Sequence, residues 1–386
     1  MSQSSADPAA QLDIAVPDDW HVHLRDDHML AAVTPLTARW FRRALVMPNL
    51  VPPITDSVAA AAYRERILAA AGPEARADFE PVMVLYVTDG VSIDDVRAGV
   101  EAGVVIGLKY YPAGATTNSD AGGTSMLSFR PLLEFMAAEG IPLLVHAEST
   151  DPTIDIFDRE RAFLDRELVP LAAELPELRV TVEHLSTAEG VEFVRDHPQV
   201  AGTITPHHLS CDRSDLLANG MRPDLYCKPV INSPQNRKAL VAAATSGSPS
   251  FFLGTDSAPH PSIHKYAANV RAGIFCAPFA LPVVAEVFHR AGALDRLEAF
   301  TSLNGCRHYG FEASTERLRL TRAADEVIDA EAANDPDGGP AEELVTADGA
   351  RVRIFGVAEA RRWTVAEVAG SDVGSGATSG ASSAIG

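Results

Sequence analysis

Lysine is scarce in this 386-residue sequence, and so are cysteine pairs, excess basic charge and long apolar runs. Only four lysines occur, so 28 of the 32 basic residues are arginine. The net charge of −20 leaves little basic surface for nucleic acid or an anionic membrane, and we expect neither as a partner. A small anionic substrate stays compatible with this charge, because a few buried arginines can reverse its sign locally.

The four cysteines, Cys211, Cys227, Cys276 and Cys306, lie far apart and form no C-x-x-C motif. We interpret them as reduced thiols that bind neither one another nor a metal. No apolar run reaches the roughly 18–20 residues of a membrane span, and the polar, acidic N-terminus lacks the features of a signal peptide. The sequence therefore predicts a soluble, cytoplasmic protein.

Short apolar segments alternate with amphipathic stretches, such as those that begin at Ser57 and Arg130. Eight of these segments are predicted strands, near 13–22, 43–48, 81–87, 103–109, 141–146, 178–184, 200–205 and 250–255. Strands that are apolar throughout and separated by helices are typical of a parallel sheet covered on both faces. The pattern predicts an α/β protein of the (β/α)8 TIM-barrel type, with its active site at the carboxyl ends of the strands.

The two ends of the chain depart from this pattern. Residues 1–10 and the Gly/Ser/Ala-rich residues 370–386 are predicted to be disordered tails. The acidic stretch from about 313 to 340 is predicted to be a surface loop, and alternating segments after it predict a small β-rich appendage from about 341. We therefore expect one domain over residues 11–369.

Seven of the eight predicted strands carry a possible metal ligand or anion-binding residue at the same end. In strand order these residues are His21, His23 and Arg25; Asn49; Lys109; His146; His184; His207 and His208; and Asp256 and His260. Imidazoles and carboxylates are zinc ligands. Each of these histidines taken alone is more often an ordinary core or surface residue, and Asp256 alone could cap a helix. Their convergence on one barrel mouth predicts a metal site.

Lys109 follows the apolar segment GVVIGL and is the only lysine among the first 227 residues. A lysine at a barrel rim can extend its charged end to solvent. A desolvated lysine would instead have a lowered pKa and could react with carbon dioxide. The resulting carbamate has two oxygens, one for each of two metal ions, and both interpretations stay open from the residue alone.

The motifs HVHLRD, VMPN, LKYYPAGATTNS, LLVHAES, VEHLST, TPHHL and GTDSAPH together resemble those of dihydroorotases of the short bacterial, homodimeric type. The resemblance runs in order from about residue 13 to 310, and GATTNS and GTDSAPH are specific to that family within the amidohydrolase superfamily. It implies a homodimer that hydrolyses dihydroorotate reversibly to N-carbamoyl-L-aspartate, the third step of de novo pyrimidine synthesis.

The same resemblance implies a role for each site residue. Two zinc ions per chain would be bridged by carboxylated Lys109 and a hydroxide, with His21, His23 and Asp256 on the more buried ion and His146 and His184 on the other. Arg25, Asn49 and His260 would bind the substrate carboxylate, Thr116 and Thr117 would belong to a loop that closes over the ring, and backbone near Lys228 and Ala272 would contact the pyrimidine. Asp256 would also carry a proton from the hydroxide to the leaving nitrogen. The sequence departs from the family pattern at Lys228, where an apolar residue is more common.

Two other functions would fit a barrel of this type: hydrolysis of another cyclic amide, and a scaffold role without catalysis. Hydantoinases and allantoinases carry extra β-structure before the first barrel strand, and a first strand near residue 13 leaves no room for it. A catalytically inactive scaffold relative would have lost metal ligands, whereas all the expected ones are present. The remaining histidines, His207, His208, His264 and His308, receive no metal role; the first two are expected to support the site, and Tyr110 and Tyr111 are expected to pack.

Overall fold

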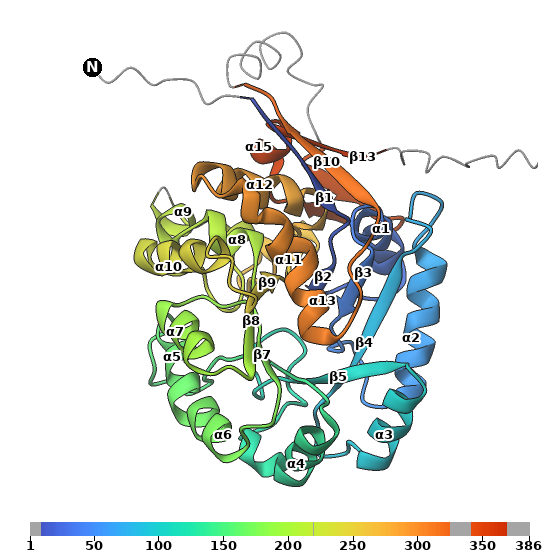
Figure 1. Cartoon of the computed structure of the whole chain (residues 1–386), viewed down its shortest axis with the longest axis vertical. Helices are drawn as coiled ribbons and strands as arrows, with labels where there is room; N and C mark the ends of the chain where they lie inside the picture. The colour runs from blue at the N-terminus through green and yellow to red at the C-terminus, as the bar shows by residue number, and fades with distance from the viewer. Residues whose placement is uncertain (1–8, 219, 325–340, 369–386) are drawn as a thin grey trace, which may run out of the picture.

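The computed structural model describes residues 9–218, 220–324 and 341–368, and its centre is a parallel sheet rolled into a barrel (Figure 1). Its eight strands run in sequence order: β2 (Asp19–Val22), β3 (Arg43–Val46), β4 (Glu80–Tyr86), β5 (Val105–Tyr110), β6 (Leu143–Val145), β7 (Val180–Val182), β8 (Val200–Ile204) and β9 (Phe251–Leu253). The barrel closes where the His23 amide donates to the Ser257 carbonyl at 3.0 Å and the Asp256 amide donates to the His21 carbonyl at 2.9 Å. The predicted (β/α)8 barrel is confirmed.

Helices connect the strands and cover the outside of the barrel (Figure 1). They are α1 (Asp27–Ala38), α2 (Ser57–Ala70), α3 (Ile93–Glu101), α4 (Arg130–Glu139), α5 (Arg159–Phe163), α6 (Val169–Glu174), α7 (Ala188–Asp196), α8 (Pro206–Ser210), α9 (Arg213–Leu217), α10 (Pro234–Ala244), α11 (Ser262–Lys265), α12 (Ala280–Arg290) and α13 (Asn304–Tyr309). Short polar side chains begin several of them: Asp56 accepts from the Ala59 amide and Thr187 from the Gly190 amide. The helices predicted from Ser57 and Arg130 are α2 and α4.

Alternate residues of each strand face the inside and the outside of the barrel, as the period of two requires. In β4, Val82 and Val84 join the inner apolar cluster, whereas Met83 and Leu85 pack with the outer helices. In β5, Leu108 packs outward, so Lys109 points into the barrel, where it is fully buried. A polar residue near the carboxyl end of a strand therefore points into the barrel when it lies at an inward-facing position, as Lys109 does.

The first predicted strand, near 13–22, is wrong as a single unit. Residues Ala10–Ala15 form β1, which pairs antiparallel with β10 (Arg317–Arg322), and β10 pairs with β13 (Trp363–Glu367) in a separate three-stranded sheet. Val16, Pro17 and the buried Asp18 separate β1 from β2. Figure 1 shows this sheet at one end of the molecule, beside α12 and α1.

Two further expectations change with this sheet. The loop predicted from about 313 to 340 contains β10, and the predicted tail 1–10 ends in Ala10, the first residue of β1. A strand outside the barrel does precede β2, so the expected lack of β-structure before the first barrel strand does not exclude a hydantoinase.

A small appendage lies where it was predicted, from about residue 341. It contains the hairpin of β11 (Glu343–Val345) and β12 (Arg351–Arg353), then α15 (Val357–Ala360) and β13. The rest of the predicted acidic loop, 325–340, and most of both predicted tails lie outside the described residues.

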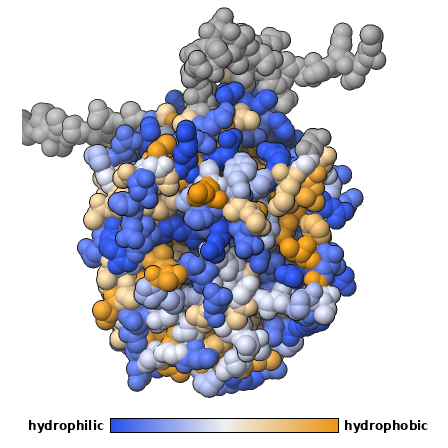
Figure 2. Space-filling view, turned by 180° about the vertical axis from the view of Figure 1, so that it is seen from behind, coloured by the Kyte–Doolittle hydropathy of each residue, from blue (hydrophilic) through white to orange (hydrophobic). Residues whose placement is uncertain are grey.

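The surface seen in Figure 2 carries hydrophobic residues as separate patches between hydrophilic ones. Among the described residues, no helix combines the length and the apolar composition needed to cross a membrane.

Candidate metal centre and active site

Eleven of the thirteen predicted site residues line one cavity at the carboxyl ends of the strands. They are His21, His23, Arg25, Asn49, Thr116, Thr117, His146, His184, Lys228, Asp256 and Ala272. The other two contact this set: His260 lies 3.1 Å from Arg25, and Lys109 is buried close to His21 and His184. Seven elements far apart in sequence thus contribute to one site, which is the consequence of a parallel barrel.

His21, His23 and Asp256 form the first group of possible metal ligands. The two Nε2 atoms lie 3.3 Å apart, and Asp256 Oδ1 is 3.3 Å from the first and 3.1 Å from the second. Ligand atoms around a tetrahedral zinc ion with bonds of about 2.0–2.1 Å lie roughly 3.3 Å from one another. The spacing of these three atoms therefore fits one divalent ion.

His146 and His184 form the second group, on neighbouring strands. His146 Nδ1 lies 3.1 Å from His184 Nε2, so the two lone pairs meet at one point. His146 Nε2 lies 3.0 Å from Glu148 Oε2, a contact that fixes the ring and leaves Nδ1 as the ligand atom. The geometry fits a second cation next to the first group, since the ring centres of His21 and His184 lie 5.1 Å apart.

Glu183 is a functional candidate that the sequence argument quoted in VEHLST but did not assign. It is fully buried, contacts Lys109 Nζ, and lies 2.9 Å from His21 Nδ1. A carboxylate beside the outer nitrogen of an imidazole orients the ring and strengthens it as a ligand. The sequence did contain a signal for Glu183. It is an ionisable residue directly before His184, and it follows Thr181 by two residues, so the period of two predicts that it faces the inside of the barrel as Thr181 does.

Burial sets the protonation of these groups. It lowers the pKa of Lys109 well below the usual range of a lysine, which favours the neutral amine. It also lowers the pKa of His23 to about 4 and that of His184 well below its usual value, which leaves the imidazole lone pairs free. Burial alone would raise the pKa of the Asp256 carboxyl, but hydrogen bonds from His21 and His23 hold it well below its usual range.

The backbone is strained at three of the predicted site residues. Arg25, His184 and Asp256 adopt left-handed conformations with φ of 60°, 44° and 45°. Such conformations are unfavourable for residues other than glycine and gather at functional sites. Here they turn each side chain toward the cavity at the point where its strand ends.

Arg25 provides a cation at the edge of the cavity. Its Nε donates to the Pro259 carbonyl at 3.2 Å, and its Nη2 lies 3.1 Å from His260 Nε2, so its contacts are a carbonyl and an imidazole rather than a carboxylate. His260 Nε2 also lies 2.9 Å from the Ala272 carbonyl. The guanidinium can therefore pair with an anion that enters the cavity.

The loop with Thr116 and Thr117 lies across the cavity and is tied down on two sides. Asn49 Nδ2 donates to the Thr117 carbonyl at 2.9 Å, while Asn49 Oδ1 lies 2.9 Å from His23 Nδ1. Lys228 Nζ donates to the Ala115 carbonyl at 2.7 Å. The side chain of Lys228, an unusual residue at this position, thus holds the loop, in addition to the backbone contact with substrate that the resemblance implies.

The two tyrosines and the four histidines without a predicted metal role lie in different places. Tyr110 packs against Phe129 and Phe163 as expected, whereas Tyr111 lines the cavity, with Lys109 Nζ 4.8 Å from its ring centre. The four histidines without a metal role divide into three places. His264 is exposed on α11, His308 contacts Thr181 at the opposite end of the barrel, and His207 and His208 form a separate group with Cys227.

Comparison with known proteins identifies the family. Residues 16–359 match the amidohydrolase family. A dihydroorotase of Ruegeria pomeroyi is 53% identical over 313 residues, which cover 81% of this chain and 90% of the relative. The crystal structure of a Saccharomyces cerevisiae dihydroorotase in complex with 5-fluoroorotic acid superposes with a TM-score of 0.80 at 29% identity, covering 92% of this chain and 98% of that one.

An L-hydantoinase of Arthrobacter aurescens shares the fold at a lower level. It superposes with a TM-score of 0.66 at 19% identity, covering 80% of this chain and 76% of the hydantoinase. At this identity the likeness shows the fold alone, whereas the dihydroorotase of Ruegeria pomeroyi matches at 53% identity over 81% of the chain. The chain therefore belongs to the amidohydrolase family and, within it, to the dihydroorotases.

Proposed function

We propose that this chain hydrolyses the cyclic amide of (S)-dihydroorotate to N-carbamoyl-L-aspartate and catalyses the reverse ring closure, the third step of de novo pyrimidine synthesis. The observation that carries the proposal is the cavity itself. Two pairs of buried imidazoles and a carboxylate line it, a buried lysine lies close to these imidazoles, and a guanidinium that contacts a carbonyl and an imidazole lies at its edge. The 53% identity to a dihydroorotase supports the same activity.

We assign two zinc ions per chain to the two ligand groups. His21, His23 and Asp256 would hold one ion, His146 and His184 the other, and Lys109 would bridge them as a carbamate. When bound, the two cations would supply an ionised water at neutral pH and positive charge to stabilise the developing oxyanion. Carboxylation needs a neutral amine, since the amine attacks carbon dioxide and releases one proton, and burial favours that form of Lys109.

Asp256 is the group we assign to proton transfer. Its carboxylate lines the cavity and, with its pKa held low, is ionised at neutral pH. It can accept the proton of the attacking water and deliver it to the amide nitrogen as the ring opens. In ring closure the same group removes the proton from that nitrogen.

Arg25 and its neighbours are assigned to the carboxylate of the substrate that does not react. A guanidinium matches a carboxylate with two parallel hydrogen bonds. His260 and Asn49, which flank Arg25 and the loop, complete this side of the cavity. The related yeast dihydroorotase holds 5-fluoroorotic acid, a pyrimidine that carries a carboxylate.

We also propose that the chain works as a homodimer in the cytoplasm. The likeness to short bacterial dihydroorotases supports the assembly, and four free cysteines support a reducing compartment. Light scattering on the purified protein would test the dimer, for which we expect about 82 kDa, twice the 41.0 kDa of one chain.

The activity is tested with purified protein of known metal content. We expect hydrolysis of dihydroorotate and cyclisation of N-carbamoyl-L-aspartate, with hydantoin and allantoin turned over at least 100-fold more slowly. Chelation should abolish the activity and added zinc should restore it. Faster turnover of hydantoin or allantoin than of dihydroorotate would contradict the assignment.

A further inference from the structure

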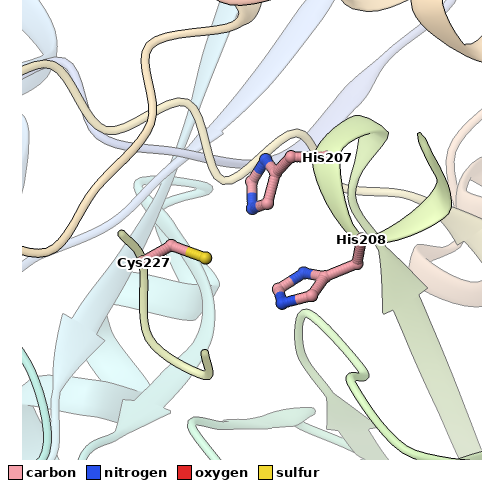
Figure 3. A group of neighbouring side chains, drawn as sticks. All are labelled: His207, His208 and Cys227. Atoms are coloured by element: carbon pink, nitrogen blue, oxygen red, sulfur yellow. The ribbon is translucent and has the colours of Figure 1, made fainter. Parts of the chain in front are cut away.

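A second cluster of metal-ligand side chains lies beside the catalytic cavity but uses none of its proposed ligands. His207 and His208 belong to α8, directly after β8, and Cys227 lies on the segment that leads to Lys228. Figure 3 shows both rings and the thiol pointing toward one another across a short gap. One ligand atom from each residue lies within 4.8 Å of the other two, and all three residues are buried.

His207 is not satisfied by the protein around it. The residue is 0% exposed, and among the described residues neither ring nitrogen has a hydrogen-bond partner. One edge of its surroundings is the ring of Phe355, which meets it at 88° and offers no polar atom. A buried imidazole with two unpaired nitrogens is unfavourable, and in native proteins such a group calls for a further partner.

The neighbours show that the region is otherwise well paired. His208 Nδ1 lies 2.9 Å from Thr205 Oγ1, and His208 Nε2 lies 3.1 Å from the Pro229 carbonyl. The Cys227 thiol donates to the same carbonyl at 3.2 Å. The two nitrogens of His207 without a hydrogen-bond partner therefore lie next to one imidazole and one thiol whose polar atoms are paired. The region around them is not one in which polar groups generally lack partners.

We propose that His207, His208 and Cys227 bind an additional divalent cation, most suitably zinc, distinct from the two in the catalytic cavity. Two imidazoles and one thiolate form a typical zinc ligand set, and three protein ligands leave a fourth position for water. Zinc bonds of about 2.0 Å to nitrogen and 2.3 Å to sulfur place such ligand atoms roughly 3.3–3.6 Å apart. The side chains would thus close inward on the ion, and His208 would exchange the Pro229 carbonyl for it.

The position of the cluster gives the cation a structural task. Cys227 directly precedes Lys228, which lines the catalytic cavity and holds the Ala115 carbonyl of the loop above it. An ion shared by α8 and Cys227 would fix this segment against the end of β8. The proposal does not depend on the catalytic assignment, because it involves other residues and a different donor, sulfur.

Sulfur also provides a selective measurement. The proposed catalytic ligands are imidazoles, a carboxylate and a carbamate, so a thiolate-to-cobalt charge-transfer band in the cobalt-loaded full-length protein reports only a site with a cysteine. We expect this band in the unaltered protein and its complete loss in Cys227→Ser. Cys276→Ser is the matched control, because Cys276 is equally buried in the same apolar cluster, and it should keep the band at full intensity.

Metal content and stability complete the test. The unaltered protein as purified should hold about one zinc ion per chain more than Cys227→Ser, and added zinc should raise the melting temperature of the first by several degrees more than that of the second. In His207→Leu, the cobalt concentration needed to produce the band should rise at least tenfold, because one of the three ligands is lost. Absence of the band in the unaltered protein, equal zinc contents, or an unchanged band in His207→Leu with a higher melting temperature would overturn the proposal. A count of two ions in both proteins would do so while leaving the catalytic pair intact.

Discussion

Lys109 shows how one buried residue can decide the chemistry of a whole site. The side chain is fully buried inside the barrel, burial lowers the pKa of its amine, and it lies close to histidines of both groups. A neutral lysine cannot hold two cations together, whereas its carbamate carries a negative charge and two oxygens. The proposed carboxylation therefore converts the least favourable residue of the barrel interior into a bridging ligand.

Replacement of this lysine gives the first prediction. Lys109→Ala should lower kcat/KM by at least 1000-fold and remove at least one of the two zinc ions assigned to the catalytic cavity, because the bridge between these ions disappears. Short carboxylic acids added to the variant should restore part of the activity by filling the space of the carbamate. Lys238→Ala, at an exposed position of α10, is the control and should behave like the unaltered protein. Normal kinetics in Lys109→Ala would exclude the carbamate.

Arg25 and Asp256 should respond differently to conservative changes. Arg25→Lys keeps the charge but loses the bidentate fork, so binding should weaken by about 1–3 kcal/mol, with KM rising and kcat falling as the ring loses its orientation. Asp256→Asn removes the proton carrier, so kcat should fall by about 10²–10⁴ with little change in KM. Steady-state kinetics at matched metal content separate the two. Unchanged constants in Arg25→Lys, or an active, metal-loaded Asp256→Asn, would show that these roles are misassigned.

At the scale of elements, the barrel strands and the outer sheet differ in how far sequence alone can predict them. Each barrel strand pairs with the next one along the chain, so an apolar run followed by a helix already identifies it. β1 instead pairs with β10, Leu12 opposite Leu320, across some 300 residues, and no local pattern encodes such a partner. The site residues at the strand ends were predictable because each directly follows an apolar strand in the sequence. The role of Glu183 and the side-chain contact of Lys228 were not predictable, because both depend on residues that are distant in sequence and adjacent only in the fold.

The loop over the cavity provides an element-scale prediction. Lys228 Nζ donates to the Ala115 carbonyl at 2.7 Å, which ties the loop to the opposite wall. Lys228→Met keeps the length of the side chain but removes the donor, so we expect KM for dihydroorotate to rise about threefold to tenfold with melting temperature within about 2 °C. Lys238→Met, on exposed α10, controls for the loss of one positive charge. A KM equal to that of the control would mean that the loop closes without this contact.

The outer sheet is joined to the barrel by a buried ion cluster. Glu286 of α12 accepts from Arg322 of β10 at 2.9 Å and from Trp363 of β13 at 2.8 Å. Glu286→Ala should lower the free energy of unfolding by about 2–4 kcal/mol, because it removes the carboxylate that accepts hydrogen bonds from both Arg322 and Trp363 in a buried place. Arg290→Ala, whose exposed side chain contacts the same carboxylate, should lower it by less than about 1 kcal/mol. Urea unfolding of both variants measures the difference, and equal values would show that the cluster does not anchor the sheet.

At the scale of the whole molecule, an acidic protein with buried neutral histidines should be sensitive to acid. The net charge of −20 means that lowering the pH first reduces repulsion among surface carboxylates, which favours the folded state. The buried histidines act in the opposite direction. Burial lowers the pKa of His23 and His208 to about 4 and that of His308 to about 3, so these rings stay neutral in the fold while they take up protons in the unfolded chain.

The sign of the pH dependence follows from these values. Above the unfolded pKa of about 6.5 both states leave the rings neutral, and the folded state is not penalised. Between about 6.5 and 4 the unfolded chain binds more protons at its histidines, so these rings make stability fall as the pH falls. Burial raises the pKa of Asp19 to about 6 and that of Glu160 to about 7, which acts in the opposite direction, but the histidines with a lowered pKa outnumber these two carboxyls. We therefore expect the melting temperature of the metal-free protein to drop by more than about 10 °C from pH 7 to pH 5, measured at constant ionic strength. His308→Gln, far from both metal groups, should lessen this drop; a melting temperature that rises toward pH 5 would show that surface charge, and not the buried histidines, governs acid stability.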